Sequence, residues 1–506
     1  MKNSLVEIGP DHHLTPDVVW GVAHRPGIKV VLSKKAKRKI VESRKVVERI
    51  VEKRKVVYGV TTGFGSFKDK FIDKENVKEL QRNLIRSHSS GVGDLLSPEM
   101  VRAAMLVRAN SLAQGFSGVR LEFLEFLLLL LNKNIVPLVP SQGSVGSSGD
   151  LAPLSHIGLV MMGEGEVWYR GKKMNAAAAL KKEKLSPVGF LEKEGLAFNN
   201  GTSVMTGIAA LALHKAENLL KIADMGVALT LEAVCGLSYA FDSRVHAVRP
   251  HPGQIESARN IKRYIQGSKL VNSMKKRVQD SYSLRCSPQV HGAVRDALAY
   301  VRGVVERELN SVTDNPLIFT NPDGAVSGGN FHGEPIAIAL DTLGIAVAEL
   351  ADVSERRTAK LIDPAMNAGL PIFLIPEGKG GLHNGLMIPQ YVAASLVSEN
   401  KVLAHPASVD SIPTSVNQED HVSMGTIAAR KAWNIVNNAE NVIAIEYLNA
   451  TQAIDFRDPK KLGKRTKKTY AYVRKHVKKV NNDRILAKDI QAIRNTFGAI
   501  SESILS

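Results

Sequence analysis

Four long stretches of this chain carry apolar residues at helical spacing, and they constrain its fold more than any other feature. Several are hydrophobic nearly all round, which is typical of helices buried in the middle of a large bundle or at a subunit interface. The stretches span residues 201–234, 291–312, 333–361 and 421–454. The pattern predicts a mainly α fold: a large bundle of long central helices with a smaller, loop-rich N-terminal part.

The remaining periodicity predicts few strands. Short strands are expected at residues 56–60, at 165–173, and on both sides of a Pro-Asp-Gly turn within 315–329. The apolar run at 121–134 is too short to cross a bilayer and contains two glutamates, so it predicts a buried helix and no membrane partner.

No repeat, low-complexity tract or Pro/Ser-rich linker divides the 506 residues. We therefore expect one interlocked chain over residues 1–506. Its polar loops concentrate in about 1–200, and the central helical bundle and C-terminal helices occupy about 201–506.

A formal net charge of +18 raises the question of nucleic-acid binding. The cations cluster in residues 33–57 and 457–479, and the first cluster alternates with glutamates and with apolar residues at helical spacing. That mixture is typical of a solvated amphipathic helix. Aromatic residues make up only 5% of the chain and no recognition motif is present, so we expect no nucleic-acid partner.

Cysteine usage indicates a reducing compartment. Only Cys235 and Cys286 are present, too few for a disulfide framework or a cysteine zinc site. The N-terminal stretch MKNSLVEIGPDHHL has no apolar signal core. We expect the cytoplasm.

Six polar, glycine-rich segments interrupt the helical pattern, and loops held by a rigid scaffold commonly carry function. They span residues 58–67, 83–94, 143–156, 198–203, 279–292 and 415–425.

The segment GSVGSSGDLAPLSH, residues 143–156, fits none of the common catalytic loops. A phosphate-binding loop needs a lysine where this chain has Asp150. A serine-hydrolase elbow needs glycine two residues on either side of the nucleophile, and Ser148 has Gly146 before it but Asp150 after it. A turn capping a helix from Leu151, with Asp150 as N-cap, explains Asp150 and Pro153 but not the four small residues at 146–149.

A backbone cyclisation does explain those small residues. The amide nitrogen of Gly149 can attack the carbonyl carbon of Ser147 and close a five-membered ring, and only glycine lacks the Cβ that would block this approach. Loss of water from the Ser148 side chain then leaves a methylidene group. The product is 4-methylidene-imidazol-5-one, an electrophile made from the chain by loss of two waters.

The segment closely resembles the cofactor-forming loop of the aromatic amino acid ammonia-lyases, in which Ala-Ser-Gly precedes DLAPLSH. The resemblance covers nearly the whole chain, includes the five other segments in the same order, and favours the histidine branch of the family. The chain departs from the family at Ser147, where alanine is usual. Because the ring uses only the backbone carbonyl of this residue, serine should be tolerated, although it adds a hydroxyl beside the ring.

The resemblance implies a catalytic role for several side chains. Tyr58 matches the base or proton shuttle on a mobile loop, and a tyrosine in a polar site can have a lowered pKa. Tyr282 matches the tyrosine that approaches the electrophile, and Asn200 the asparagine that hydrogen-bonds the cofactor or the substrate carboxylate. Phe331 matches an aromatic wall of the pocket.

Two residues imply the choice of substrate. His88 lies where phenylalanine enzymes of the family carry an apolar residue, and an imidazole can hydrogen-bond another imidazole. Glu419 matches the carboxylate that the histidine branch places near the substrate ring; its alternative role is that of an acid at a helix N-terminus. Gln279, Tyr282 and Arg285 are spaced three apart and should share one face of a helical turn, where the Arg285 fork would bind the substrate carboxylate.

The implied reaction is the deamination of L-histidine to trans-urocanate and ammonia, the first step of histidine degradation. Tyrosine and phenylalanine ammonia-lyases or aminomutases of the same family are the alternative, and the sequence leaves open which substrate atom attacks the ring. The resemblance implies a homotetramer with each pocket assembled from three chains, and no external cofactor. We expect no metal, and we expect His156, His291 and His332 to be structural, because they lack metal-ligand spacing.

Overall fold

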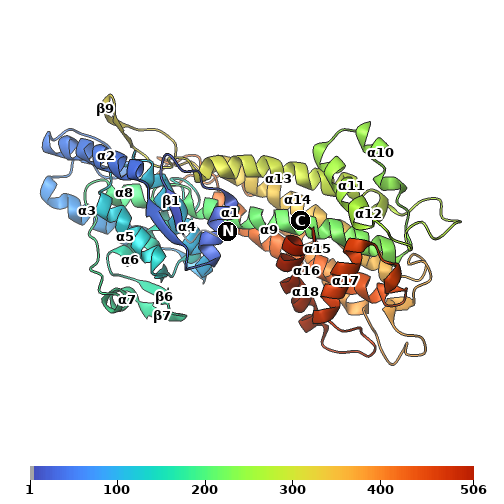
Figure 1. The fold of residues 1–506 in the computed structure, drawn as a ribbon. Coiled ribbons are helices and arrows are strands. Elements are labelled where there is room, and N and C mark those ends of the chain that lie inside the picture. The colour runs from blue at the N-terminus through green and yellow to red at the C-terminus, as the bar shows by residue number, and fades with distance from the viewer. Residues whose placement is uncertain (1–4, 506) are drawn as a thin grey trace. The chain divides into compact units, whose positions relative to one another are not determined.

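The structure, a computed structural model, describes residues 5–505 and confirms a mainly α protein that is 58% helical (Figure 1). The first four residues of the N-terminal stretch MKNSLVEIGPDHHL lie outside the described residues. The chain divides into two compact units, each built from three separate stretches. The first unit comprises Met1–His214, Arg302–Asp341 and Pro406–Arg430, and the second comprises Lys215–Val301, Thr342–His405 and Lys431–Ser506.

The four long helices expected from periodicity are present. They are α9 (Ser203–Ala233), α13 (Ser287–Leu309), α14 (Glu334–Ile362) and α16 (Gly425–Ile454). Each contains one of the boundaries between the two units, so both units are built partly from the same helices.

The first unit contains eight further helices whose starts follow ordinary capping chemistry. Ser33 caps the second of them and Ser97, followed by Pro98, caps the fourth, each through its hydroxyl. The helices are α1 (Pro16–His24), α2 (Lys34–Glu52), α3 (Lys74–His88), α4 (Pro98–Ala113), α5 (Leu121–Asn132), α6 (Leu151–Met161), α7 (Ala176–Lys182) and α8 (Glu194–Asn199). Helix α5 confirms the buried helix predicted for 121–134, with Glu122 and Glu125 on its exposed side.

The strands of the described chain are short, and they lie in the first unit. They are β1 (Leu5–Ile8) parallel to β2 (Lys29–Leu32), β3 (Val92–Leu95) with β5 (Pro140–Gln142), β4 (Val136–Pro137) with β6 (Glu166–Tyr169) and β7 (Lys172–Asn175), and β8 (Leu317–Thr320) with β9 (Asp323–Val326). The two hairpins β6–β7 and β8–β9 were expected.

The strand predicted for residues 56–60 is wrong, because this segment forms a turn. The amide of Val60 donates to the carbonyl of Val57, and the amide of Val57 donates to the Thr61 hydroxyl at 2.9 Å. These local bonds replace those that a neighbouring strand would supply.

The second unit adds six helices around its share of the long ones. They are α10 (Ser243–Ala247), α11 (Pro252–Tyr264), α12 (Tyr282–Arg285), α15 (Met387–Leu403), α17 (Lys464–His476) and α18 (Leu486–Ile500). Short turns of 3₁₀ helix occur in the two units at Gly65–Phe67, Tyr239–Phe241, Ile372–Leu374 and Pro459–Lys461, and a π-helical turn at Ser501–Leu505.

Buried charge organises the core of the second unit. The carboxylate of Glu446 accepts hydrogen bonds from Arg357 at 2.6 and 2.8 Å, from Ser354 at 2.6 Å and from Thr230 at 2.9 Å. All four residues are completely buried, so every partner is a protein group rather than water. His291, expected to be structural, belongs to the same core.

The basic segment at residues 33–57 folds as the amphipathic helix that its pattern predicts. Helix α2 buries one face, including Ile40 and Val47, and pairs Arg38 with Glu42 and Arg44 with Glu48 along its length. Among residues 5–505, no helix combines the length and the apolar character that a membrane crossing requires.

Candidate active site

The turn at residues 146–149 is tight because glycines stand at both of its ends. Gly146 and Gly149 pair across the turn, with Ser147 and Ser148 between them. The Ser148 carbonyl accepts from the amide of Gly201 at 2.9 Å, and Gly149 runs alongside Gly201. A Cβ at Gly149, where φ is +74°, would lie 2.1 Å from the Gly201 carbonyl oxygen. No other residue fits at 149, as the cyclisation requires.

Asp150 holds this turn in place in a way that sequence reasoning did not foresee. It stands at the N-cap position of α6, but its side chain does not cap that helix. Its carboxylate instead accepts from the amides of Val204 at 2.8 Å and Met205 at 2.9 Å, at the start of α9, and from the Thr426 hydroxyl. Burial raises the pKa of Asp150 to about 6 although these donors oppose it. The expected cap is therefore a cap of a different helix.

Two adjoining cavities of the first unit, of about 740 and 790 Å³, meet at Ser148. Five residues line both of them: Tyr58, Gly65, Ser148, Leu196 and Glu419. His88 lines the second cavity, and Ser147, Asn200 and Phe331 line the first. Buried Gly149 lies behind this wall. The structure thus brings together eight of the candidate residues around one half-buried hydroxyl, and the residues of the turn fit the methylidene-imidazolone ring.

Tyr58 lies on a loop that lines both cavities. Its hydroxyl accepts from the amide of Gly65 at 3.3 Å. Burial raises the pKa of Tyr58, and the carboxylate of Glu419 adds to the rise. This direction is opposite to the lowering expected from sequence, because the negative charge of Glu419 and the loss of water both disfavour a phenolate.

The Tyr58 loop is bonded to the segment that carries Glu419. The Ser66 hydroxyl donates to the Ser415 carbonyl at 2.7 Å, and the Lys68 ammonium donates to the Gln418 side chain at 2.6 Å. Sequence reasoning placed both loops at the site but had no signal for these contacts, which lie about 350 residues apart in the chain.

Glu419 is held by two hydroxyl donors. The Thr414 hydroxyl donates to Oε2 at 2.6 Å, and the Ser148 hydroxyl donates to Oε1 at 3.5 Å. Glu419 precedes α16 by several residues and lies in an irregular segment, so the alternative role of a helix N-terminal acid is not needed to explain it. Thr414 was missed, since a threonine five residues upstream carries no motif.

His88 is the last residue of α3. Its Nδ1 lies 3.0 Å from the hydroxyl of Ser87. Burial lowers the pKa of His88, and the Leu84 carbonyl and Glu419 oppose that change only in part. The ring is therefore neutral near pH 7.

Asn200 and Phe331 line the first of the two cavities. Asn200 donates to the Asn315 carbonyl at 3.0 Å, and its own Oδ1 is buried without a partner. Next to Phe331, His332 stacks on His421 with ring centroids 5.7 Å apart, and both histidines line the cavity. His332 was expected to be only structural, yet it faces the site.

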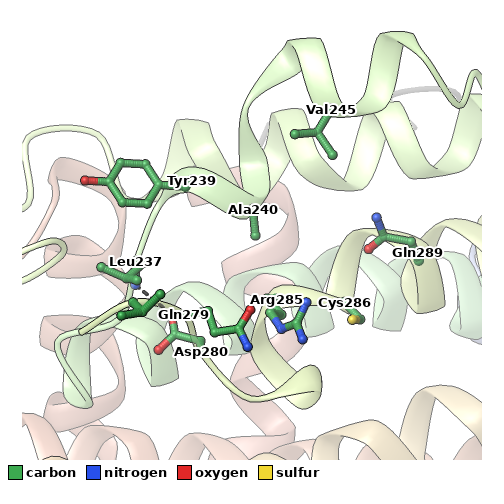
Figure 2. A pocket seen from close by; sticks show the side chains of 10 residues that line it. Leu237, Tyr239, Ala240, Val245, Gln279, Asp280, Arg285, Cys286 and Gln289 are labelled. Atoms are coloured by element: carbon green, nitrogen blue, oxygen red, sulfur yellow. Dashed lines mark hydrogen bonds between the residues drawn. The ribbon is translucent and has the colours of Figure 1, made fainter.

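Gln279, Tyr282 and Arg285 belong to the second unit and line neither cavity of the first. Gln279 and Arg285 line a separate pocket of about 260 Å³ (Figure 2). The expected shared helical turn is only partly correct: Tyr282 and Arg285 lie on α12, whereas Gln279 precedes it. Tyr282 is 70% exposed, and the Arg285 guanidinium lies 4.4 Å from the centre of its ring.

The pocket in Figure 2 offers one unmatched donor to an anion, beside acceptors that do not suit one, among them the Asp280 carboxylate. The Nε of Arg285 is buried without a hydrogen-bond partner, as is Oε1 of Gln289. A planar guanidinium with free donors is the usual partner of a carboxylate.

The remaining histidines have protein partners. The Nε2 of His156 accepts from the amide of Gly91 at 3.2 Å, and His291 pairs with Asp224 at 2.8 Å with both side chains fully buried. Within the described part of the chain, no three His, Cys, Asp or Glu side chains converge as a metal site would require.

Known proteins are similar in sequence to this chain over almost its whole length. The family model for aromatic amino acid lyases matches residues 14–475. The chain is 55% identical to the histidine ammonia-lyase of Treponema denticola over 477 residues, and this aligned region covers 94% of each protein. It is 52% identical over 468 residues to the histidine ammonia-lyase of Natranaerobius thermophilus, which covers 92% of each.

Solved structures agree with these matches. The histidine ammonia-lyase of Trypanosoma cruzi has a TM-score of 0.91 and 41% identity, over 98% of this chain and 94% of that one. The tyrosine aminomutase of Streptomyces globisporus has a TM-score of 0.92 and 38% identity, over 98% and 97%. The chain belongs to the aromatic amino acid lyase family and is a carbon–nitrogen lyase.

Proposed function

We propose that this enzyme deaminates L-histidine to trans-urocanate and ammonia, as the first step of histidine degradation. The observation that carries the proposal is the meeting of His88, Glu419 and Ser148 on one cavity. An imidazole and a carboxylate beside the reacting centre suit a substrate with a polar, hydrogen-bonding ring. The histidine ammonia-lyases among the relatives support the same substrate.

The cofactor in this proposal is 4-methylidene-imidazol-5-one formed from Ser147, Ser148 and Gly149, with no external group. The glycine at 149 and the half-buried Ser148 hydroxyl support it. Once formed, the ring supplies an electrophile that makes the substrate amine a better leaving group. The added hydroxyl of Ser147 leaves the backbone chemistry unchanged.

The proton chemistry falls to Tyr58, which would take the β-proton of the substrate. Since burial and Glu419 raise its pKa, only a small fraction is ionised at neutral pH, and its capacity as a base grows as pH rises. Asn200 would hydrogen-bond the cofactor or the substrate carboxylate through the Nδ2 hydrogen that the Asn315 carbonyl leaves free. Phe331 would close the apolar side of the pocket.

Arg285 would bind the substrate carboxylate, with Gln279 beside it and Tyr282 next to the electrophile. We propose that the enzyme is a homotetramer in which neighbouring copies supply residues to each pocket. Exposed apolar side chains on helices α14 and α15 of the second unit, including Ile345, Ile388 and Tyr391, support an oligomer. We further propose a cytoplasmic enzyme without metal or nucleic-acid partners.

The test is to mix purified protein with L-histidine and follow the ultraviolet absorbance of urocanate. Intact-mass spectrometry of the same sample should show a loss of two waters per chain, and an unmodified mass in active protein would refute the cofactor. The alternative, a tyrosine or phenylalanine lyase or aminomutase, would be supported by turnover of those amino acids at rates matching that of histidine.

A further inference from the structure

The hydrogen bonds around His88 favour one of its two ring nitrogens as the carrier of the proton. The hydroxyl of Ser87 donates its single proton to the Leu84 carbonyl at 3.1 Å. Its oxygen is then an acceptor for His88 Nδ1, 3.0 Å away, and the Leu84 carbonyl, which also bonds the His88 ring, can only accept. Both contacts favour Nδ1 as the nitrogen that carries the proton of the neutral ring. Within residues 5–505, the other nitrogen, Nε2, has no hydrogen-bond partner, and it is left as an acceptor at the cavity that His88 lines.

Glu419 offers a second acceptor to the same cavity. Both of its oxygens accept from hydroxyl groups, one from Thr414 and one, at 3.5 Å, from Ser148. The Ser148 hydroxyl is the group that leaves as water when the proposed ring forms. Oε1 therefore loses its donor in the mature enzyme, while Thr414 still fixes the carboxylate.

The other charged groups of the two cavities do not replace that donor. The ammonium of Lys68 bonds Gln418, and that of Lys70 lies 5.1 Å from the centre of the Phe67 ring. Asp69 and Asp420 are further carboxylates, and the remaining titratable groups are Tyr58, His332 and His421. With Glu419, three carboxylates face two ammonium groups, so the cavities favour a cation.

We propose that His88 Nε2 and the Glu419 carboxylate act as a pair of acceptors that binds the substrate ring as the imidazolium ion. A neutral imidazole has one N–H and would leave one of these two half-buried acceptors unmatched, whereas imidazolium has two. The inference rests on the proposed function and adds the protonation state of the bound substrate. A positive ring next to the β-carbon also makes its C–H more acidic, which eases the work of Tyr58.

The probe is 3-(imidazol-4-yl)propanoate, which has the ring and carboxylate of the substrate but no amine to eliminate. Mature wild-type enzyme is titrated calorimetrically at pH 8 in two buffers of different ionisation enthalpy. The free ring has a pKa of about 6.5 and is mostly neutral there. We expect about one proton taken up per site, and a Kd that weakens about tenfold for each pH unit above 7.

Two variants test whether the proton uptake depends on the Glu419 carboxylate. Glu419→Gln replaces an acceptor by an amide that donates to the bare nitrogen of a neutral ring, so binding should persist while proton uptake falls to near zero. Asp420→Asn removes the adjacent, exposed carboxylate and should still take up about one proton.

Binding without proton uptake in the wild type, equal uptake in Glu419→Gln, or no binding of the probe would each overturn the inference. Urocanate formation from L-histidine, measured on the same preparation, tests the proposed function separately. An active enzyme that binds the probe as neutral imidazole refutes this inference alone, and an inactive one refutes the function.

Discussion

In the second unit, the carboxylate of Glu446 is surrounded by donors, whereas the polar groups around Ser148 in the first unit are only partly matched. Both oxygens of Glu446 accept from Arg357 and from a buried hydroxyl. Near Ser148, Oδ1 of Asn200 has no partner and Oε1 of Glu419 has one long contact. Buried polar groups whose hydrogen bonds are all made stabilise a core, whereas polar groups without partners can still hydrogen-bond a ligand.

The largest expected effect is on the reacting centre itself. Ser148→Ala removes the hydroxyl that is lost as water, so activity should fall below detection while the fold and oligomer persist. Intact mass should show wild type lighter than its sequence by two waters, with no loss of the side-chain water in the variant. Retained urocanate formation in Ser148→Ala would show that the cavity around this residue is not the reacting centre.

Substrate preference should depend on the unmatched groups. A site that hydrogen-bonds the substrate ring rejects an analogue without those groups by a factor on the order of 10⁴, so we expect that ratio of kcat/KM for L-histidine over L-phenylalanine. His88→Leu should reduce the ratio by about 10-fold to 100-fold, because one missing hydrogen bond leaves a buried polar group unpaired. An unchanged ratio in the variant would leave the family assignment intact but refute the choice of substrate.

The matched cluster should respond in stability rather than in substrate preference. Glu446→Ala leaves the buried guanidinium of Arg357 without its partner, and breaking such a pair costs about 3–5 kcal/mol. Glu48→Ala, which breaks an ion pair whose carboxylate is largely exposed, is the control and should cost about 1 kcal/mol or less. Chemical denaturation measures both. Similar losses of stability for the two variants would contradict the larger contribution assigned to the buried ion pair.

The smallest expected effect is on the pH profile. Because burial and Glu419 raise the pKa of Tyr58 above its ordinary value, its reactive phenolate should become more populated as pH rises through 7 to 9. If Tyr58 is the base, kcat at saturating L-histidine should rise by up to about tenfold per pH unit on that limb. Glu419→Gln removes the carboxylate that adds to the rise and should shift the limb to lower pH. If the rising part of the pH profile moved to higher pH in this variant, the claim that Glu419 raises the pKa of Tyr58 would be contradicted.

Local pattern was enough for much of the fold. The spacing of apolar residues predicted the four long helices, the buried helix α5 and the amphipathic α2, because helix formation on a buried face depends on residues three and four apart. It failed at residues 56–60, where the side chain of Thr61 bonds the backbone in place of a partner strand. The parallel pair β1–β2 was also missed, because helix α1 separates its strands and no turn motif joins them.

The motifs likewise predicted most residues around the site but not their connections. Sequence alone named Tyr58, His88, Ser148 and Glu419, yet gave no sign that Thr414 would hold Glu419. It suggested a lowered pKa for the tyrosine, where burial raises it. Desolvation depends on everything that packs around a group, and no local motif records that.

By itself the sequence determined the helical class, the small residues at 146–149 and the need for glycine at 149, because these depend on residues near in the chain. Only the tertiary structure decided that Ser148 and Glu419, 271 positions apart, share one cavity, and that Asp150 bonds the start of α9 instead of capping α6. Those outcomes depend on packing between distant segments, whose geometry is set by the whole core and not by any one stretch of residues.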